Sequence, residues 1–293
     1  MTRNAVEVRG LRKQYGEVTA VDGLDLTIRQ GEVFGLLGPN GAGKSTTVEI
    51  LQGHRERDGG EVAVLGADPA TAGRAWRSRV GIVWQDESAP AELTVRETVE
   101  HFARYYPAPR DPAEVIALVG LEQKRDQRVK GLSGGQRRRL DVALGVIGDP
   151  ELLLLDEPTT GFDPAARRQF WDLIRLLAGE GTTIVLTTHY LEEAEALADR
   201  LAVIANGKVV AEGEPAALRS RFGTGATVEW TEADGSPRSI ATETPTRTVA
   251  ELTARFEGEI PGLKIGRPTL EDVYLRLTGQ LVPTTAQQPE DAR

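Results

Sequence analysis

The chain of 293 residues contains no cysteine, only three histidines and no long apolar run. Without cysteine there can be no disulfides and no thiolate metal sites, and so few histidines argue against a structural zinc site. No apolar run approaches the roughly 20 residues that a membrane-spanning helix needs, and residues 1–10 lack the apolar core of a signal peptide. We therefore expect the chain by itself to be soluble and cytosolic.

Acidic residues outnumber basic ones, 44 to 35. The net charge is -9, so nothing in the composition attracts nucleic acid in general, and no nucleic-acid partner is expected. Any nucleotide must therefore be captured by a local site. With 293 residues the chain can bury a sizeable core, and this length predicts one large and one small domain.

A glycine-rich loop between a strand and a helix is the feature around which the chain is organised. It fits the pattern G-x-x-x-x-G-K-[ST], follows the apolar run 33–37 and precedes a helix expected from Lys44. Glycines let backbone N–H groups point inward, and the helix N-terminus adds free donors and a positive dipole end. The loop is therefore predicted to bind polyphosphate, in preference to being a chance glycine-rich turn. Its residues are Gly38, Pro39, Asn40, Gly41, Ala42, Gly43, Lys44, Ser45 and Thr46. Lys44 is expected to reach the β and γ phosphates, and the Ser45 hydroxyl to bind the accompanying Mg²⁺.

Two carboxylates follow a second apolar strand, 151–155. Asp156 and Glu157 stand at its carboxyl end, where open α/β sheets bind their ligands. Asp156 is expected in the Mg²⁺ shell, which leaves Glu157 to polarise a water for attack on the γ phosphate. A helix-capping acidic pair is the alternative. It is disfavoured because four consecutive leucines bury the strand and leave only its end exposed.

Three weaker features fit a nucleotide site and also have plain structural explanations. Tyr15 can stack on a base or belong to the core. The run L-S-G-G-Q at 132–136 opens a helix whose first serine and glycines either bind a second anion or merely cap that helix. His189 follows the strand expected at 182–187 and either donates to the γ phosphate or is structural.

The remaining patterns predict the domain plan. Alternating runs at 5–9 and 24–28 read as antiparallel strands, and 61–65 and 80–84 as further strands. Residues 86–148 are expected to form a helical insertion, entered through a capping box at Thr94. Its basic residues are expected on a solvated or interdomain helix face; they are Arg137, Arg138 and Arg139. A hairpin at 201–212 closes the sheet of a domain spanning 1–222. A small α+β domain is expected at 223–281, followed by a disordered tail at 282–293.

Together, Tyr15, the phosphate loop, Gln85, the L-S-G-G-Q run, Asp156-Glu157, Asp163 and His189 occur in an order that resembles the ATP-binding cassette (ABC) family over residues 4 to about 220. The resemblance implies an α/β fold, with a RecA-like P-loop NTPase core, an antiparallel β subdomain and a helical insertion. It also implies ATP and Mg²⁺ as cofactors. Phe162 departs from the family, where leucine is usual, but leaves Asp163 in place.

The same resemblance implies roles for individual residues. Tyr15 would stack on adenine, and Gln85 would link Mg²⁺ and the attacking water to a membrane partner. Glu157 would be the catalytic base, His189 would contact the γ phosphate, and Asp163 would communicate between subunits. The signature residues would bind the γ phosphate of ATP held by the other subunit of a head-to-tail homodimer; they are Ser133, Gly134, Gly135 and Gln136.

The segment 268–279, P-T-L-E-D-V-Y-L-R-L-T-G, is similar to the C-terminal segment of ATPase subunits from drug-resistance and antibiotic exporters. Their permeases are separate membrane polypeptides, so the resemblance implies a peripheral subunit at the cytoplasmic face of the membrane. ATPase subunits of importers remain an alternative. Soluble ABC proteins of translation or DNA repair are disfavoured, because the chain has one phosphate loop and only 46 residues between Gln85 and Leu132. A non-catalytic regulator would be expected to lack Glu157 or His189.

Overall fold

The computed structural model describes residues 3–84, 91–222, 225–256, 258–266 and 269–279. These residues divide into two compact units, one ending at Pro215 and the other beginning at Ala216, whereas the sequence suggested a division after residue 222. Gln85 and the tail expected to be disordered, 282–293, lie outside the described residues. In the part of the chain that is described, no helix has the length and apolar character needed to cross a bilayer.

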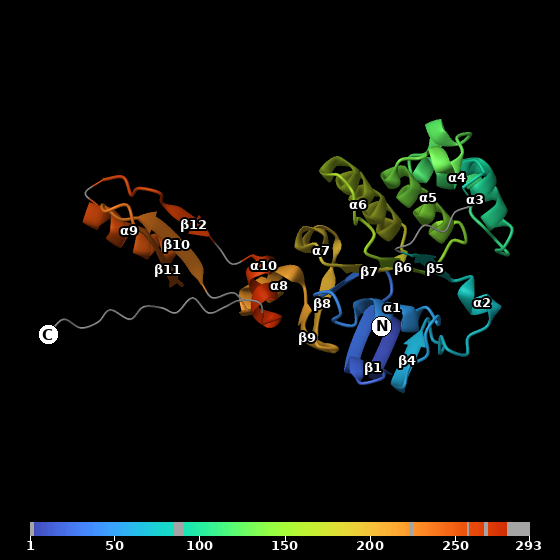
Figure 1. Ribbon diagram of the computed structural model, residues 1–293, viewed down its shortest axis with the longest axis horizontal. Coiled ribbons are helices and arrows are strands. Elements are labelled where there is room, and N and C mark those ends of the chain that lie inside the picture. The colour runs from blue at the N-terminus through green and yellow to red at the C-terminus, as the bar shows by residue number, and fades with distance from the viewer. Residues whose placement is uncertain (1–2, 85–90, 223–224, 257, 267–268, 280–293) are drawn as a thin grey trace. The chain divides into compact units, whose positions relative to one another are not determined.

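A six-stranded sheet forms the centre of the first unit (Figure 1), in the order β5-β6-β7-β3-β8-β9. Neighbouring strands are parallel from β5 to β8, and β9 pairs antiparallel with β8, which confirms the hairpin at the sheet edge. The strands are β3 (Val33–Leu37), β5 (Val80–Val83), β6 (Leu152–Asp156), β7 (Thr183–Thr188), β8 (Arg200–Ala205) and β9 (Lys208–Gly213). Because β3, β7 and β6 are parallel and only β7 lies between the other two, the phosphate loop and Asp156 follow the carboxyl ends of strands on the same side of the sheet.

Layers cover both faces of this sheet, which explains why its inner strands are buried and largely apolar. Leu153 and Leu155 pack in a core with helices of the insertion and α6, while Leu152 and Leu154 pack in a second core with α1 and a small antiparallel sheet. The alternation follows from the strand geometry, in which successive side chains point to opposite faces. The helices are α1 (Lys44–Leu51), α2 (Arg74–Arg77), α3 (Val95–Ala103), α4 (Pro112–Leu118), α5 (Gly134–Val146), α6 (Pro164–Gly179) and α7 (Leu191–Leu197), with 3₁₀ helices η1 (Glu122–Lys124) and η2 (Val129–Gly131).

The antiparallel sheet has the order β2-β1-β4 and longer strands than the sequence pattern indicated. Its members are β1 (Asn4–Tyr15), β2 (Val18–Arg29) and β4 (Gly59–Val64). The expected ends of the first two strands, 5–9 and 24–28, were wrong because register shifts between Val8 and Leu11 and between Lys13 and Gln14 break the two-residue alternation. Tyr15 is therefore the last residue of β1, paired with Val18 across a tight hairpin.

Side-chain caps fix where the functional helices begin. Thr94 and Glu97 form the predicted capping box of α3, and Ser133 and Gln136 form a second one at α5. Asp163 caps α6 by accepting from the Ala166 amide at 2.8 Å, with proline at the first helical position. Ser133 of the L-S-G-G-Q run and Asp163 are thus both held at helix N-termini.

The second unit has the α+β pattern expected from the sequence. Its sheet has the order β11-β10-β12, and every pair is antiparallel. Val228 of the central strand, Leu252 and Ile260 form its small core. The elements are α8 (Pro215–Phe222), β10 (Ala226–Thr231), β11 (Pro237–Thr242), α9 (Pro245–Phe256), β12 (Lys264–Gly266) and α10 (Leu270–Leu277).

Candidate functional site

The phosphate loop connects β3 to α1 in a conformation that requires glycine. Gly41 and Gly43 have positive φ angles of 79° and 103°. A Cβ atom on Gly38 would clash with the carbonyl oxygen of Ile204, and one on Gly43 with that of Ala20. Larger residues would therefore force the loop away from its neighbours. The Ala42 amide bonds the Pro39 carbonyl at 3.1 Å within the loop, and the first amides of α1 are the kind of donors that bind anions at a helix N-terminus.

Lys44, the first residue of α1, folds back over the loop. Its Nζ donates to the carbonyl oxygens of Gly38 at 2.7 Å and Pro39 at 3.1 Å. Only 5% of the residue is exposed, and this burial lowers the pKa of Lys44, while the negative charges of Glu157 and Asp156 act to raise it. An ammonium group held this way is oriented along the loop and can exchange carbonyl partners for phosphate oxygens.

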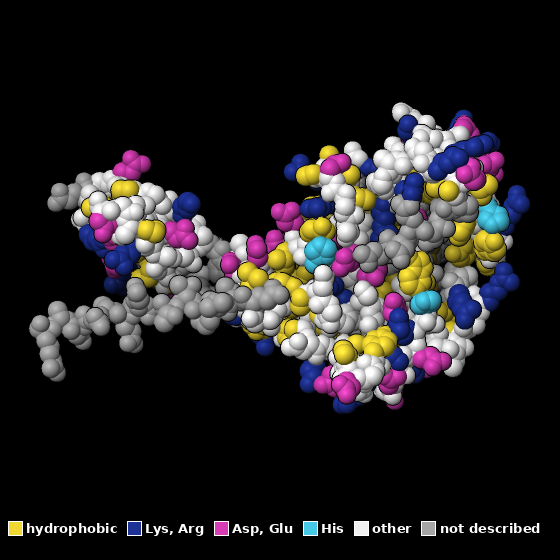
Figure 2. Space-filling model, viewed as in Figure 1, with side chains coloured by type: hydrophobic (Ala, Val, Ile, Leu, Met, Phe, Trp, Pro, Cys, Tyr) yellow, Lys and Arg dark blue, Asp and Glu magenta, His cyan; other side chains and the backbone are white. Residues whose placement is uncertain are grey.

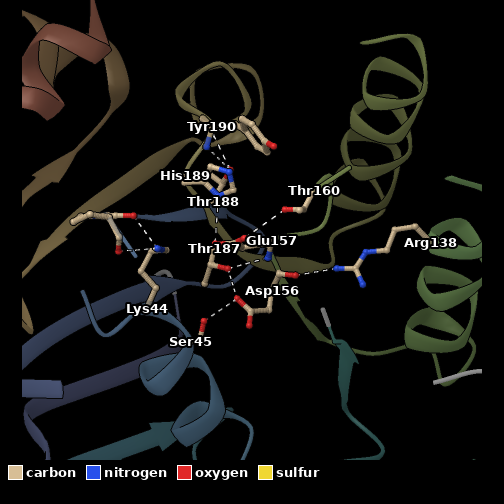
Figure 3. Close-up of polar contacts among 12 residues, drawn as sticks. Lys44, Ser45, Arg138, Asp156, Glu157, Thr160, Thr187, Thr188, His189 and Tyr190 are labelled. Atoms are coloured by element: carbon tan, nitrogen blue, oxygen red, sulfur yellow. Dashed lines mark hydrogen bonds and ion pairs between the residues drawn. The ribbon is translucent and has the colours of Figure 1, made fainter. Parts of the chain in front are cut away.

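Asp156 lies where β6 and β7 end side by side (Figure 3). Its Oδ1 atom accepts a hydrogen bond from Ser45 at 3.4 Å and a short one from the Thr187 hydroxyl, the residue opposite it in the parallel register. The two side chains expected to bind Mg²⁺, Ser45 and Asp156, thus come from separate elements and meet at the base of the loop.

Glu157 follows Asp156 with a strained backbone and a well-held carboxylate. Its φ of 44° lies in the left-handed region, which costs a non-glycine residue about 1–3 kcal/mol. Its amide donates to Thr187 Oγ1 at 3.0 Å, its Oε1 lies 3.3 Å from Nδ1 of His189, and its Oε2 accepts from Thr160 at 3.4 Å. The fold therefore fixes both the backbone and the carboxylate of the predicted base, with His189 beside it (Figure 3).

A depression of about 500 Å³ joins these parts, a volume within the usual range of ligand sites. It takes in the phosphate loop, the start of α1, the beginning of β2 and Glu157. Its lining residues are Val18, Ala20, Asn40, Gly41, Gly43, Lys44, Ser45, Thr46 and Glu157. Glu157 thus lines the same depression as the residues predicted to bind phosphate.

Tyr15, Ser133 and Asp163 are not among the residues that line this depression. Tyr15 is 39% exposed, and Arg55 Cζ lies 5.2 Å and Lys13 Nζ 5.5 Å from the centre of its ring. Ser133 is exposed at the N-terminus of α5, and of the described residues that line the depression none comes from the signature. Asp163 acts as the cap of α6.

Three residues that hold the site together were not identified from the sequence. Thr187 bonds both Asp156 and the Glu157 amide, and its place two residues before His189 at a strand end was the available signal. Arg138 was expected on a solvated or interdomain helix face, and because it is only 8% exposed, the solvated alternative was wrong. Glu193 is completely buried on α7, where it accepts from Trp171 at 3.3 Å and where burial raises the pKa of its carboxyl group.

Comparison with known proteins agrees with this geometry. Residues 21–160 match the family model described as ABC transporter. The chain is 44% identical to the Nod factor export ATP-binding protein I of Ralstonia nicotianae, over 94% of each chain. It is 39% identical to the daunorubicin/doxorubicin resistance ATP-binding protein of Streptomyces peucetius, over 98% of this chain and 96% of that one.

A solved structure of a dimeric ATP-binding cassette in a post-hydrolysis state, bound to ADP and Pi, superposes with a TM-score of 0.64. It is 25% identical and covers 71% of this chain and 98% of its own. The matched cassette accounts for the α/β core with its parallel sheet, and the two relatives match nearly the whole chain. From its phosphate loop, the carboxylates at the end of its buried strand β6 and these matches, we conclude that the chain belongs to the ABC transporter family, as one of its ATP-binding subunits.

Proposed function

We propose that the chain is the ATP-hydrolysing subunit of an exporter and works as a head-to-tail homodimer on a separate membrane permease. One observation carries the hydrolytic part: the Glu157 carboxylate lines the same depression as the phosphate loop and is held by Thr160 and His189. The names of the two relatives, one for Nod factor export and one for drug resistance, support the export direction. We propose a drug or antibiotic as cargo, and the cytoplasmic face of the membrane as the place of action.

In this proposal each part of the depression has one task. The loop amides and Lys44 bind the β and γ phosphates, and Tyr15 stacks on adenine. Glu157 accepts a proton from the attacking water, whose oxygen bonds to the γ phosphorus. The bond from that phosphorus to the oxygen bridging the β and γ phosphates breaks, which gives ADP and phosphate. His189, beside Glu157, contacts the γ phosphate. Gln85, outside the described residues, is proposed to link the water and Mg²⁺ to the permease.

The residues at the base of the loop fit a magnesium ion. Ser45 and Asp156 offer a hydroxyl and a carboxylate oxygen 3.4 Å apart, and oxygen is the ligand that Mg²⁺ prefers. Among the described residues no group of three or more His, Cys, Asp or Glu gathers to form a complete protein cage. A few protein oxygens that leave places for phosphate and water are typical of magnesium at nucleotide sites. When bound, Mg²⁺ would neutralise the charge that develops on the phosphates.

Two copies are proposed because the exposed signature needs a ligand from elsewhere. Ser133 accepts from the Gln136 amide at 3.3 Å, which leaves its hydroxyl hydrogen free to donate, and the first amides of α5 face outward beside it. These groups suit the γ phosphate of ATP bound to the phosphate loop of a second copy. The dimeric cassette structure described above supports this arrangement.

A mixed-dimer experiment tests the head-to-tail arrangement. Lys44→Ala should abolish tight ATP binding, and Ser133→Arg should block hydrolysis by placing a bulky cation where the partner's γ phosphate would lie. A dimer of one copy of each carries both lesions in one composite site and keeps the other intact, so mixing the two inactive proteins should restore part of the ATPase activity. Folded, dimerising variants that never restore activity when mixed would argue against a signature that acts in trans.

The surface after Gln85 is proposed to contact the permease. On its described part, Arg96 and Glu100 are exposed, and the Tyr105 ring is 55% exposed in an edge-to-face cluster with His101 and Phe102. Basic and acidic side chains are interspersed over the face of the protein seen in Figure 2. Aromatic residues and arginine are enriched in protein interfaces, so Tyr105 and Arg96 are the first candidates for the contact.

Co-purification with the membrane protein encoded beside the chain tests this surface. We expect Arg96→Glu combined with Tyr105→Ala to weaken permease binding and stimulation of ATPase activity, without changing ATP affinity. Glu97 is a poor choice for charge reversal, because its carboxylate bonds the Thr94 amide at 2.8 Å and loss of the capping box would cost about 1 kcal/mol. Arg77→Glu, the same charge reversal at an exposed position of α2 in the first unit, is the matched surface control.

Truncation after Pro215 tests the second unit in the same assay. Because the unit has its own core, its removal should spare ATP affinity and weaken dimerisation or permease binding. The cut is placed at Pro215, since a later one would leave α8 without the rest of its unit, where Arg276 donates to the Phe222 carbonyl at 3.1 Å. If the truncated and doubly substituted forms both bind and respond like the full chain, neither surface couples to the permease.

A further inference from the structure

Arg138 occupies an unusual place for a charged residue. It lies in α5, five positions after Ser133, and its guanidinium is buried. All three of its nitrogens donate to main-chain carbonyl oxygens: Nε to Pro158 at 3.1 Å, one terminal nitrogen to Asp156 at 2.9 Å, and the other to Trp84 in a short bond. A single side chain of α5, the helix that begins at Ser133, thus bonds three separate peptide groups at or just after the carboxyl ends of β5 and β6.

The positions of these carbonyls connect Arg138 to the reaction. Asp156 and Pro158 flank Glu157, so the guanidinium hydrogen-bonds to the main chain on both sides of the predicted base. Trp84 directly precedes Gln85 in the sequence. Glu157 has the left-handed φ of 44°, a conformation that persists only where its surroundings over-determine it. Besides Arg138, the Thr187 hydroxyl holds the same turn through the Glu157 amide.

We propose that Arg138 is a positioning residue that couples the signature helix to the catalytic base. Ser133 and Arg138 stand on one helix, whose hydrogen-bonded backbone moves as a unit. A displacement of its N-terminus on contact with the partner's ATP is passed through the guanidinium to the peptides around Glu157. This inference rests on the proposed roles of Glu157 and Ser133. It adds the side chain through which contact of Ser133 with the partner's ATP changes the position of Glu157.

The competing explanation is that Arg138 only stabilises the fold, as a buried and well-bonded arginine can. Both explanations predict that Arg138→Met, which keeps much of the length and removes the charge and donors, lowers the melting temperature. They differ in what happens to the molecules that remain folded. A positioning role lowers kcat per nucleotide-binding site, whereas a purely structural role lowers only the number of such sites.

The experiment compares full-length parental protein, Arg138→Met, Arg138→Lys and the control Arg139→Met, with binding sites counted by titration with a fluorescent ATP analogue. Arg139, the next residue, bonds Gln169 of α6 and loses the same charge. For Arg138→Met we expect kcat per site to fall at least about tenfold with ATP affinity within about threefold of parental. The kcat per site of Arg138→Lys should lie between those of the parental protein and Arg138→Met, because an ammonium cannot span three carbonyls as the planar guanidinium does. If Arg138→Met does not fold, Arg138→Lys still tests the proposal. An unchanged kcat per site in both variants would overturn the proposal.

A double-mutant cycle with Glu157→Gln separates action through Glu157 from general damage. If Arg138 works by placing that carboxylate, adding Arg138→Met to Glu157→Gln should change the residual single-turnover rate by less than about threefold, because no base is left to misplace. An equal loss in the two backgrounds would overturn the inference and leave the proposed function intact. Near-parental hydrolysis by Glu157→Gln alone would instead remove the proposed base.

Discussion

Glu157→Gln is expected to reduce ATP hydrolysis by about a hundredfold or more while leaving ATP binding near parental. Glutamine keeps the shape of the side chain and can still bond Thr160, but it cannot accept a proton from the attacking water. Because Glu157 lines the depression beside the phosphate loop, its loss should stop the reaction after nucleotide binding. ATP should then hold two copies together, which size-exclusion chromatography with light scattering would show.

Glu192→Gln is the matched control for this change. Glu192 is exposed on α7, three residues after His189, and undergoes the same chemical substitution outside the depression. Its hydrolysis rate should stay near the parental value. If Glu157→Gln hydrolyses ATP as fast as this control, another base must be considered, with His189 and Asp163 as the first candidates.

The second large effect is expected from Lys44→Ala, which should weaken ATP binding by roughly 30- to 150-fold. This range corresponds to about 2–3 kcal/mol for a charge-assisted contact to phosphate. The substitution also removes the donor that bonds the Gly38 and Pro39 carbonyls, so the loop loses an internal support together with its cation. Isothermal titration with MgATP measures the affinity directly.

Thermal unfolding without nucleotide separates these two consequences of Lys44→Ala. A loss of loop order alone would lower the melting temperature and leave the affinity of the folded protein little changed. Lys264→Ala in β12 removes an exposed cation of the second unit and should affect neither measurement. Parental ATP affinity in Lys44→Ala would remove this lysine from its proposed role.

The sequence determined the parts of the site that depend on local geometry. The phosphate loop was recognisable because a strand, a glycine-rich turn and a helix follow one another directly, and the structure has β3, the loop and α1 at those places. The capping box at Thr94 and the helix start at Ser133 were predictable for the same reason, since a cap involves residues only three positions apart. The α/β class followed from apolar strands that alternate with helical segments.

Tertiary structure alone decided which distant residues hold these parts in place. Thr187 reaches Asp156 only because β6 and β7 are neighbours in parallel register, and nothing in the local sequence states that pairing. Arg138 stands between two other arginines in a polar helix turn, so its pattern indicated a solvated or interdomain helix face. The packing of α5 against the sheet decided between them and buries Arg138 among carbonyl groups.

The same limit applies to the strained turn at Glu157 and to the length of β1 and β2. A left-handed glutamate is unfavourable by local propensity, and it is held by partners 19 and 30 positions away, Arg138 and Thr187. The hairpin that ends at Tyr15 continues through bulges that erase the alternating pattern, because pairing with β2 and β4 outweighs the local irregularity. Local sequence thus indicated the phosphate loop and the proposed base, while contacts between distant segments decided how the carboxylate and backbone of Glu157 are held.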